Sequence, residues 1–591
     1  MVFSYQLASN NMYGPRTPYS EELHATKYRA DGETFDDYCV RYSRTASDDE
    51  MHFRHLLDGL RHQRILPAGR QQLAVGRPYD ITAMNCYVGG TIPDTSEGIM
   101  DELKYSMLTL RSGGGCGWDF STLRPYGDPI RGLGIKAYST GPVSFMECWD
   151  SMCNTVLSAG HRRGAMMGVL RVDHPDIMRF INAKAKDDYL TNFNISVAIT
   201  DRFMDALEKD DTYDLVFADK VYDTVRASDV WARIMERNWD WADPGVLFID
   251  RINEQNPLAY CEEIAATNPC GEQPLPPNGA CLLGSLNLIQ YLVKMPMGTG
   301  DNEYEFDWNL FKLDAATACR AFDNVIDHTR YPLARQREEA LNKRRMGVGI
   351  TGTANALETL GYKYASPDYI KMQNKILETL RDVLYNASAT AAKAHGSFPA
   401  FKADKWLASG FARTLPKRIR DKIKKQGLRN GLLLSIAPTG TISMCADNVS
   451  SGIEPPFAMS QKRLVHMPEG QIEVELKDYA YAFHNVKGKT TYEVSGSDHV
   501  KVLCAAQKYI DSAVSKTCNV AGVENSGKKK KGQITYDEFK RLYLQAYKEG
   551  AKGCTTFNLN GKRFGILTVN DSDEGAACRI DPVTGATSCE T

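Results

Sequence analysis

The sequence has 591 residues, of which 43% are hydrophobic, and its 71 basic and 73 acidic side chains leave a net charge of -2. A chain of this size can bury a large core. The balanced charge argues against a nucleic acid polymer as partner, because such binding needs clustered cations. No apolar run is long enough to cross a membrane, and no secretion signal opens the chain, so we expect a soluble, cytoplasmic protein.

Residues 1–80 are polar and follow a helical pattern, which predicts an amino-terminal helical cap region. From residue 81 to about 565, apolar runs such as 193–199 and 432–437 predict buried strands, and they alternate with amphipathic stretches such as 366–395. This alternation favours an α/β catalytic body. A helix is predicted over 535–549.

The lysine run 528–531, which precedes that helix, is interpreted as a solvated turn, and an anion-binding role is the alternative. Residues 566–591 are rich in Asp, Gly and Ser and predict a mobile tail. The fifteen cysteines form an odd number spread through a long chain, which argues against a secreted disulfide framework. A reducing compartment with a few reactive thiols fits them better.

The strongest chemical signal is the loop 268–275, in which Asn268, Cys270 and Glu272 occupy alternate positions. In an extended loop, alternation points the three side chains to one side. Asn268 could then bind a polar substrate, Cys270 could attack or abstract, and Glu272 could move a proton. The alternative is a tight turn that contains a buried structural cysteine.

This loop resembles the finger loop of ribonucleotide reductases. Further segments match that family in the same order, from about residue 60 to the carboxyl end; they are 85–88, 113–125, 160–167, 192–197, 281–288, 344–349 and 438–443. The resemblance implies a ten-stranded α/β barrel of two five-stranded parallel halves, with the Cys270 loop at its centre. About 85 residues precede Cys86 and none of them forms a nucleotide-cone motif, so we expect no ATP-binding cone in this region.

For the chemistry, the resemblance implies a thiyl radical on Cys270 that takes the 3′-hydrogen of the ribose. Glu272 would be the base for the 3′-hydroxyl, and Asn268 would order the sugar hydroxyls. Such a radical must be protected from water, so we expect an enclosed and rigid site.

Reduction consumes two electrons, and two thiols that can form a disulfide are the simplest source. Cys86 and Cys281 match the reducing pair of the family, and Cys86 would also protonate the departing 2′-hydroxyl. Cys578 and Cys589 resemble the carboxyl-terminal dithiol that carries electrons from thioredoxin or glutaredoxin. A zinc half-site is the alternative for these two cysteines, but no further ligand stands at a suitable spacing, and we expect no metal site.

The segment 438–443 follows an apolar run, so its backbone N–H groups could hold a phosphate, although a plain turn is the default interpretation. By resemblance, the substrate diphosphate would contact Pro438, Thr439, Gly440, Thr441 and Ile442. The nucleoside would be lined by Asn85 and Gly115.

An allosteric site for a deoxynucleotide or ATP effector is implied in the same way. Asp94, Arg124 and Arg131 match its binding residues, although Asp94 is offset by one position from the usual spacing. Arg162 and Arg163 match the loop that passes effector identity to the substrate site. Taken alone, each arginine would be interpreted as part of a surface salt bridge.

The family divides by radical source. Members with a separate metal subunit relay the radical through a tyrosine pair, and the matching segment here reads Thr555, Thr556 and Phe557. Phenylalanine has no phenolic proton to exchange. No glycyl-radical motif is seen either, which leaves adenosylcobalamin as the expected cofactor. The alternative is a large subunit that needs a metal-containing partner.

The predicted reaction is the conversion of a ribonucleoside diphosphate, or less favourably a triphosphate, to a 2′-deoxyribonucleotide and water. The predicted assembly is a homodimer. A nucleotide-binding regulatory or scaffold protein is a competing hypothesis, and the intact set of Cys86, Asn268, Cys270, Glu272 and Cys281 argues against it.

Overall fold

The computed structural model describes residues from Tyr13 onward, except 131–134, 157–163, 186–187, 297–302, 468–469, 524–528, 530–531, 563–577, 581–586 and 590–591. For residues 461–474 and for the strands after residue 577, only the backbone is described. None of the described helices combines the length and apolar character needed to span a lipid bilayer.

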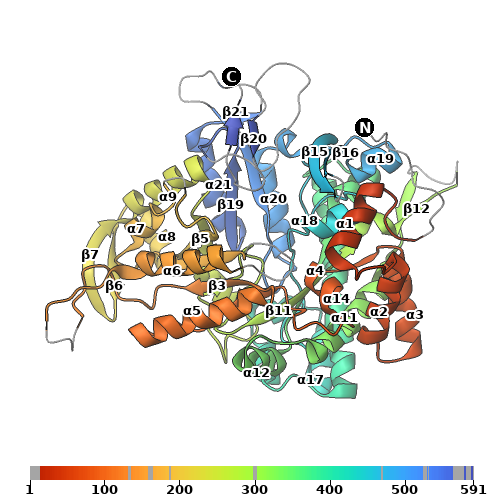
Figure 1. Cartoon of the computed structure of the whole chain (residues 1–591), viewed down its shortest axis with the longest axis horizontal. Coiled ribbons are helices and arrows are strands. Elements are labelled where there is room, and N and C mark those ends of the chain that lie inside the picture. Colours follow the sequence, from red (N-terminus) through yellow and green to blue (C-terminus); the bar gives the residue numbers. More distant parts are fainter. Residues whose placement is uncertain are drawn as a thin grey trace.

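One half of the central sheet consists of strands that are all parallel to their neighbours (Figure 1). In order they are β2 (Cys86–Val88), β3 (Gly115–Asp119), β4 (Met166–Arg171), β5 (Phe193–Ile199) and β8 (Gly245–Phe248). Their residues are almost continuously buried, as expected for parallel strands that are covered on both faces.

The other half also runs in parallel. Its named strands are β11 (Ala280–Asn287), β14 (Met346–Thr351), β17 (Thr517–Gly522) and β19 (Gly553–Asn558). Parallel bridges from Val348 to Leu434 and from Ile436 to Val514 place the segment 432–437 between β14 and the residues that lead into β17. With that segment, this half contains five parallel members.

The two halves meet in antiparallel pairings of β2 with β11 and of β8 with β19. Followed in order, the pairings lead from β14 through β11 and both halves to β17, and the bridges of the segment 432–437 lie between β14 and the residues before β17. This path agrees with the two five-stranded halves that the sequence predicts, and the mixed α/β fold with a large, parallel-rich sheet is confirmed. Two further strands extend the sheet, namely β1 (Ile65–Pro67) beside β11 and β18 (Gln533–Ile534) beside β17.

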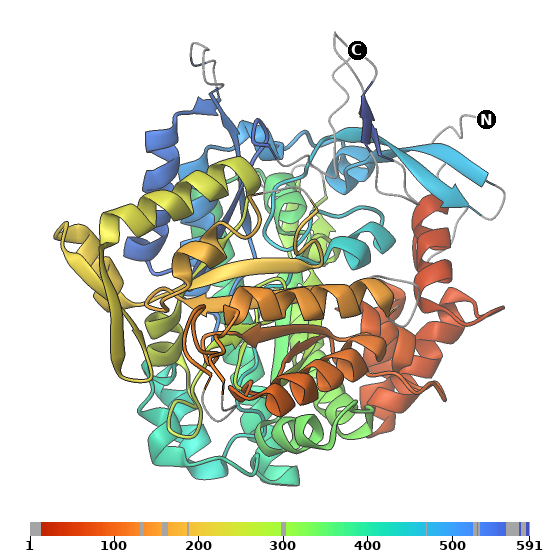
Figure 2. The same cartoon turned by 60° about the vertical axis from the view of Figure 1, so that its left-hand side comes forward.

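Helices cover the outside of the sheet (Figures 1 and 2). They include α5 (Ser96–Arg111), α6 (Gly141–Thr155), α9 (Ala227–Trp241), α11 (Trp308–His328), α12 (Ala334–Lys343), α14 (Pro367–His395), α17 (Lys417–Gln426), α20 (Gly496–Gln507) and α21 (Tyr536–Glu549). The predicted helices over 366–395 and 535–549 are confirmed, and capping explains where they begin. The Ser366 side chain caps the start of α14, and Thr535 with Glu538 forms a capping box at α21.

Residues before β2 form the helices α1 (Pro18–Tyr28), α2 (Phe35–Ala46), α3 (Glu50–Arg61) and α4 (Gly69–Ala74), drawn in red in Figure 1. Helix α1 packs against α18 (Gly440–Cys445), the short helix that contains the end of the 438–443 segment. The carboxylate of Asp447 accepts hydrogen bonds from the backbone N–H groups of Arg16 and Thr17 at 2.9 Å each. The amino-terminal region is thus attached to the body of the protein beside that segment.

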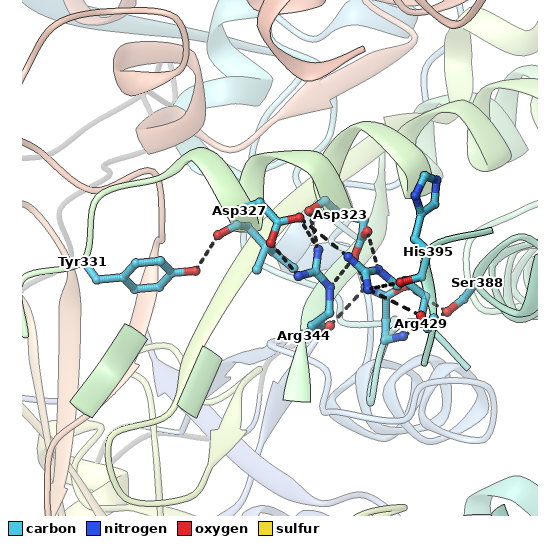
Figure 3. Close-up of polar contacts among 10 residues, drawn as sticks. Asp323, Asp327, Tyr331, Arg344, Ser388, His395 and Arg429 are labelled. Carbon is cyan, nitrogen blue, oxygen red and sulfur yellow. Dashed lines mark hydrogen bonds and ion pairs between the residues drawn. The ribbon is translucent and has the colours of Figure 1, made fainter. Parts of the chain in front are cut away.

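A charged network fixes the start of β14 against α11 (Figure 3). The Arg344 guanidinium donates to Asp323 at 2.9 Å and to Asp327 at 2.6 Å, and Arg429 donates to Asp323 at 3.0 Å. Arg344 itself adopts a left-handed conformation with φ +50°. Bidentate guanidinium–carboxylate contacts of this kind are directional, so they fix where β14 begins.

Four further pairs of described strands form two-stranded hairpins that are not part of the central sheet. They are β6 (Thr212–Phe217) with β7 (Lys220–Arg226), β12 (Leu292–Lys294) with β13 (Tyr304–Phe306), β15 (Ser460–Met467) with β16 (Gly470–Lys477), and β20 (Cys578–Ile580) with β21 (Thr587–Cys589). Of the lysine run 528–531, Lys529 is described, and its ammonium forms an ion pair with Glu538 at 2.7 Å. The other three lysines lie outside the described residues.

Candidate active site

The loop with the alternating Asn, Cys and Glu is the tip of a short hairpin made by β9 (Ala266–Thr267) and β10 (Pro274–Leu275). The tip is closed by two backbone hydrogen bonds, from the Asn268 N–H to the Gln273 carbonyl at 3.1 Å and from the Gly271 N–H to the Asn268 carbonyl at 3.1 Å. Gly271 has φ +79°, a conformation that other residues rarely adopt. The loop is therefore a defined turn and not a free connection.

The hairpin lies against the inner face of the sheet, where glycines make room for it. A Cβ atom on Gly117 of β3 would lie 1.9 Å from the Thr267 carbonyl oxygen. A Cβ on Gly347 of β14 would lie 2.5 Å from the Gln273 side chain. Backbone can approach backbone this closely only where no side chain intervenes. Both halves of the sheet thus receive the hairpin at glycine positions.

Three of the predicted site residues meet below the tip. The Asn268 side-chain amide donates to the Cys86 sulfur at 3.1 Å, and the Cys86 thiol donates to the Glu272 carboxylate at 3.7 Å. All three side chains are buried. The second carboxylate oxygen of Glu272 is buried and has no hydrogen-bond partner among the described residues. A buried carboxylate oxygen without a donor is a strong acceptor.

Burial dominates the electrostatics of this cluster. It raises the pKa of the Glu272 carboxyl above its ordinary value, although hydrogen bonds oppose the shift. It also raises the pKa of the Cys86 thiol well above its ordinary value, and the Glu272 carboxylate adds to that shift. The Cys86 thiol therefore holds its proton firmly, and the carboxyl is more basic than an exposed glutamate.

Cys86 and Cys281 occupy opposite positions in the antiparallel pairing of β2 with β11. Opposed residues in such a pair have Cα atoms roughly 4.5–5.5 Å apart, which is within the range that a disulfide requires. Both side chains are buried in the cluster that lines the inner face of the sheet. The structure thus brings together the two cysteines that the sequence proposes as a reducing pair.

Cys270 differs from the prediction of an enclosed thiol, because its side chain is exposed. The physical reason is its place at the apex of the turn, between Pro269 and Gly271 and beyond the last pair of the hairpin. Its thiol is still close enough to Cys86 to raise the pKa of that group. Cys270 is therefore the accessible edge of an otherwise buried cluster.

The residues predicted to line the nucleoside lie beside this cluster. The Gly115 N–H donates to the Asn85 carbonyl at 3.1 Å, and Gly115 is the register partner of Cys86. The side-chain oxygen of Asn85 is buried and has no partner among the described residues. Both residues thus lie next to Cys86.

The predicted phosphate segment is connected to the site through Ser435, whose hydroxyl donates to the Glu272 backbone carbonyl at 3.2 Å. Beyond it, Pro438 and Gly440 are exposed, Thr441 is half-buried and Ile442 is buried.

The Thr439 hydroxyl is occupied within the protein, since it lies 2.9 Å from the Thr351 hydroxyl. Thr439 also has φ +56°, a strained conformation for a side chain of this type.

Of the predicted effector residues, the structure brings Asp94 and Arg124 together. The Arg124 guanidinium donates to the Asp94 carboxylate at 2.7 Å, and both side chains are partly exposed. They lie after the carboxyl ends of β2 and β3, where ligands of parallel sheets commonly bind. Arg131, Arg162 and Arg163 lie outside the described residues.

Cys578 and Cys589 are opposite each other in the backbone register of β20 with β21. No metal-binding cluster of His, Cys, Asp or Glu occurs among the described residues.

Several residues that hold the loop were not singled out from the sequence. Besides Ser435, the Ala513 N–H donates to the Glu272 carbonyl at 3.0 Å. The Asn194 side chain donates to the Pro269 carbonyl at 2.8 Å. Gln273 is fully buried, and neither the nitrogen nor the oxygen of its side-chain amide is hydrogen-bonded among the described residues. Asn194 and Gln273 fall inside segments that already matched the family, whereas Ala513 carries no sequence signal because its backbone makes the contact.

Comparison with known families agrees with this geometry. The family described as "Ribonucleotide reductase, barrel domain" matches residues 84–557, which include every described site residue from Asn85 to Ile442. The chain belongs to the ribonucleotide reductase family. The family match begins after the amino-terminal helices and ends within β19, so the cluster around Cys86, Asn268 and Glu272 lies inside the barrel domain of a ribonucleotide reductase.

Individual relatives are similar over most of the chain. A vitamin B12-dependent ribonucleoside-diphosphate reductase of Thermoplasma acidophilum is 34% identical over 512 residues, which cover 82% of this chain and 62% of that protein. The protein of the same name in Mycobacterium tuberculosis is 32% identical over 86% of this chain and 72% of its own length. A ribonucleoside-diphosphate reductase subunit alpha of Helicobacter pylori is 24% identical. The chain therefore spans about two thirds of the length of these ribonucleotide reductases.

Proposed function

We propose that this chain reduces ribonucleotides, with ribonucleoside diphosphates as the favoured substrates, to 2′-deoxyribonucleotides. The observation that carries the proposal is that Cys86 faces Cys281 in register while its sulfur contacts Asn268 and Glu272. A scaffold protein would have no need for two opposed thiols beside a buried carboxyl. The names of the relatives in Thermoplasma and Mycobacterium support the diphosphate as substrate.

For each group we propose the role that the resemblance to the family implies. A thiyl radical on Cys270 takes the 3′-hydrogen of the ribose and returns it at the end. The free oxygen of Glu272 accepts the proton of the 3′-hydroxyl, and its raised pKa makes it a better base than an exposed glutamate. The amide of Asn268 orders the sugar hydroxyls.

The thiol pair supplies the two electrons that the reduction consumes, together with the proton that leaves as water. Cys86 has a raised pKa and so arrives as a protonated thiol, which can give its proton to the departing 2′-hydroxyl and release water. Cys86 and Cys281 then become a disulfide and supply the two electrons. One ribonucleotide and two thiols thus give one deoxyribonucleotide, one disulfide and one water.

We propose adenosylcobalamin as the radical source, in line with relatives that are named vitamin B12-dependent. The exposed Cys270 thiol fits this role, because a large cofactor can approach it from the open side of the loop. Homolysis of a cobalt–carbon bond is the chemistry that this group supplies when bound. Positioning the ribose, holding protons and supplying electrons fall to the residues described above.

Turnover of a ribonucleoside diphosphate with adenosylcobalamin and a chemical dithiol, and with no second protein, tests both proposals. Deoxyribonucleotide formation is expected. Formation only after a metal-containing subunit is added would support the class I alternative. No product under either condition would refute ribonucleotide reduction.

For substrate binding, we propose that the backbone N–H groups of Gly440 and Thr441 contact the diphosphate, because the Thr439 hydroxyl is already occupied and Pro438 has no N–H. Space beside Gly440 is open, with no atom within 4 Å of a Cβ built there. Asn85 and Gly115 would line the nucleoside.

We also propose a deoxynucleotide or ATP effector at Asp94 and Arg124, with Arg131, Arg162 and Arg163 as further contacts. The Arg124 guanidinium is partly exposed and suited to phosphate. Thioredoxin or glutaredoxin would reduce Cys86 and Cys281 through Cys578 and Cys589, whose backbone register supports a dithiol. The proposed assembly is a homodimer, and light scattering with effector bound tests it.

A further inference from the structure

Lys552, the residue directly before β19, is buried and makes an unusual pair of contacts. Its ammonium donates to the backbone carbonyls of Asp511 at 2.6 Å and Ser512 at 2.7 Å. A buried ammonium is costly unless its donors find acceptors. Burial lowers the pKa of Lys552 to about 8, and the Asp511 carboxylate opposes the shift, so the group is largely protonated at neutral pH.

The Ser512 carbonyl belongs to the same peptide group as the Ala513 N–H, and that N–H donates to the backbone carbonyl of Glu272 at 3.0 Å. A chain of hydrogen bonds therefore runs from the Lys552 ammonium, through one peptide group, to Glu272. A cation at one end of a peptide group polarises it and strengthens the hydrogen bond made at its other end. Lys552 thus acts on Glu272 without touching it.

Asp511 fixes the second donor to the same carbonyl. Its carboxylate accepts hydrogen bonds from the backbone N–H groups of Leu433 at 2.8 Å and Leu434 at 3.0 Å, and from the Tyr385 hydroxyl at 2.6 Å. Leu434 is followed by Ser435, whose hydroxyl donates to the Glu272 carbonyl. Both donors that hold Glu272 are therefore placed by Asp511 and Lys552.

A small cavity of about 10 Å³ adjoins this pair. It is lined by Asp511, Ser512 and Lys552 together with Ile264 and Pro274 from the two sides of the Cys270 hairpin. Its volume is about that of one water molecule, so the Lys552 side chain is not closely packed on every side at this point.

We propose that Lys552 and Asp511 are positioning residues for Glu272, which hold its backbone carbonyl and so aim its carboxylate at Cys86 and the bound ribose. This inference rests on the proposed function. Neither residue contacts the substrate, so the expected effect is on the chemical step and not on nucleotide binding.

Lys552→Met removes the charge and nearly preserves the volume. Lys516→Met is the matched control, because Lys516 is also buried but its ammonium contacts Glu454 and His499 instead. Tyr385→Phe, which removes one hydroxyl from Asp511, is a second variant that keeps the core packed. It decides the question if Lys552→Met does not fold.

Hydrogen–deuterium exchange of the full chain is measured first, because it does not depend on turnover. Lys552→Met is expected to raise exchange in peptides covering 268–275 and 511–515 by about tenfold or more, and Tyr385→Phe to do so less, while Lys516→Met leaves these peptides unchanged. In turnover, Lys552→Met is expected to lower kcat by about tenfold with KM for the ribonucleotide unchanged.

Unchanged exchange at 268–275 in both Lys552→Met and Tyr385→Phe would overturn the inference, as would an equal effect of Lys516→Met. A rise in KM without a fall in kcat would overturn it as well. If the wild-type chain forms no deoxyribonucleotide, the proposed function fails, and the exchange measurement still decides whether Lys552 holds the hairpin.

Discussion

Cys86 and Cys281 face each other across the antiparallel pairing of β2 with β11, although they belong to different halves of the sheet. This pairing is one of the two strand pairings that join the halves in the described part of the chain. The proposed electron source, the pair of Cys86 and Cys281, therefore lies where the two halves of the sheet join. Its geometry depends on both halves being folded.

Mild oxidation of the folded chain should link Cys86 to Cys281, because their backbones already lie within disulfide range. Peptide mapping by mass spectrometry is expected to recover this pair. Cys86→Ser should lower turnover by about a hundredfold or more, since it removes both an acid and an electron donor. Cys319→Ala, at a buried cysteine on α11, is the control and should retain activity. Recovery of Cys86 and Cys281 only in other linkages would contradict the proposal.

Alkylation should distinguish Cys270 from the other thiols of the site. Cys270 and Cys261 are both exposed, whereas Cys86 and Cys281 are buried, so iodoacetamide is expected to label the first two. A bound ribonucleotide should protect Cys270 and leave Cys261 reactive. Loss of activity should follow the labelling of Cys270 alone, and a Cys261→Ser variant should behave like the wild type. Equal protection of both thiols would argue against a substrate site at Cys270.

The acid side of the pH–rate profile should report Glu272. Burial raises the pKa of this carboxyl, and a base must be deprotonated to act, so activity is expected to rise with pH through a value above the ordinary pKa of glutamate. Glu272→Gln should lower kcat by about 10²–10⁴-fold and remove this limb. A variant that keeps the same limb would show that another group titrates there.

Gly117→Ala should displace the Cys270 hairpin, because the added Cβ would meet the Thr267 carbonyl oxygen at 1.9 Å. Neither atom belongs to a flexible side-chain end, so the backbone must move. We expect a loss of activity of at least about tenfold. Gly410→Ala is the matched control, since Gly410 is exposed at the start of α16 (Gly410–Arg413) and its Cβ would lie 3.3 Å from the nearest atom. Equal activity of the two variants would refute the close approach.

Glu358 should make stability depend on pH away from the active site. Burial raises its pKa to about 7 from an ordinary value of 4.5. Between these values the folded state holds a proton that the unfolded state has lost, so this contribution is complete below about pH 4.5 and is lost as pH rises through 7. Glu358→Gln should therefore stabilise the fold at pH 8 by about 1–3 kcal/mol and have little effect at pH 4.5. Denaturant unfolding at the two pH values measures this, and an equal effect at both would contradict it.

The strands and helices with strong patterns were predictable from the sequence. The apolar run at 193–199 became β5 with the same bounds, and the amphipathic stretch 366–395 became α14 starting one residue later. The segment 432–437, predicted as a strand, forms no continuous strand in the structure. It takes its place in the sheet through two isolated bridges, because the Asp511 carboxylate and other non-strand groups satisfy part of its backbone.

The site was predictable from the sequence only where its groups are side chains. Cys86, Asn268, Glu272 and Cys281 could be proposed from motifs, and the structure brings them together. The support of Glu272 by Ala513 could not, because a backbone N–H has no signature in a sequence and depends on the fold alone. The exposure of Cys270 was also missed, since alternation in a loop does not determine which residue stands at its apex.

The contact of Asp447 with the amides of Arg16 and Thr17 has a practical consequence for anyone who trims this protein. The family match starts at residue 84, which makes the preceding stretch look dispensable. Cutting there would remove the two amides that bind this almost fully buried carboxylate, and would uncover α18, against which α1 packs. A fragment that begins at residue 84 is therefore expected to bind nucleotides poorly. The contacts that it lacks are made by residues more than 400 positions before Asp447 in the chain.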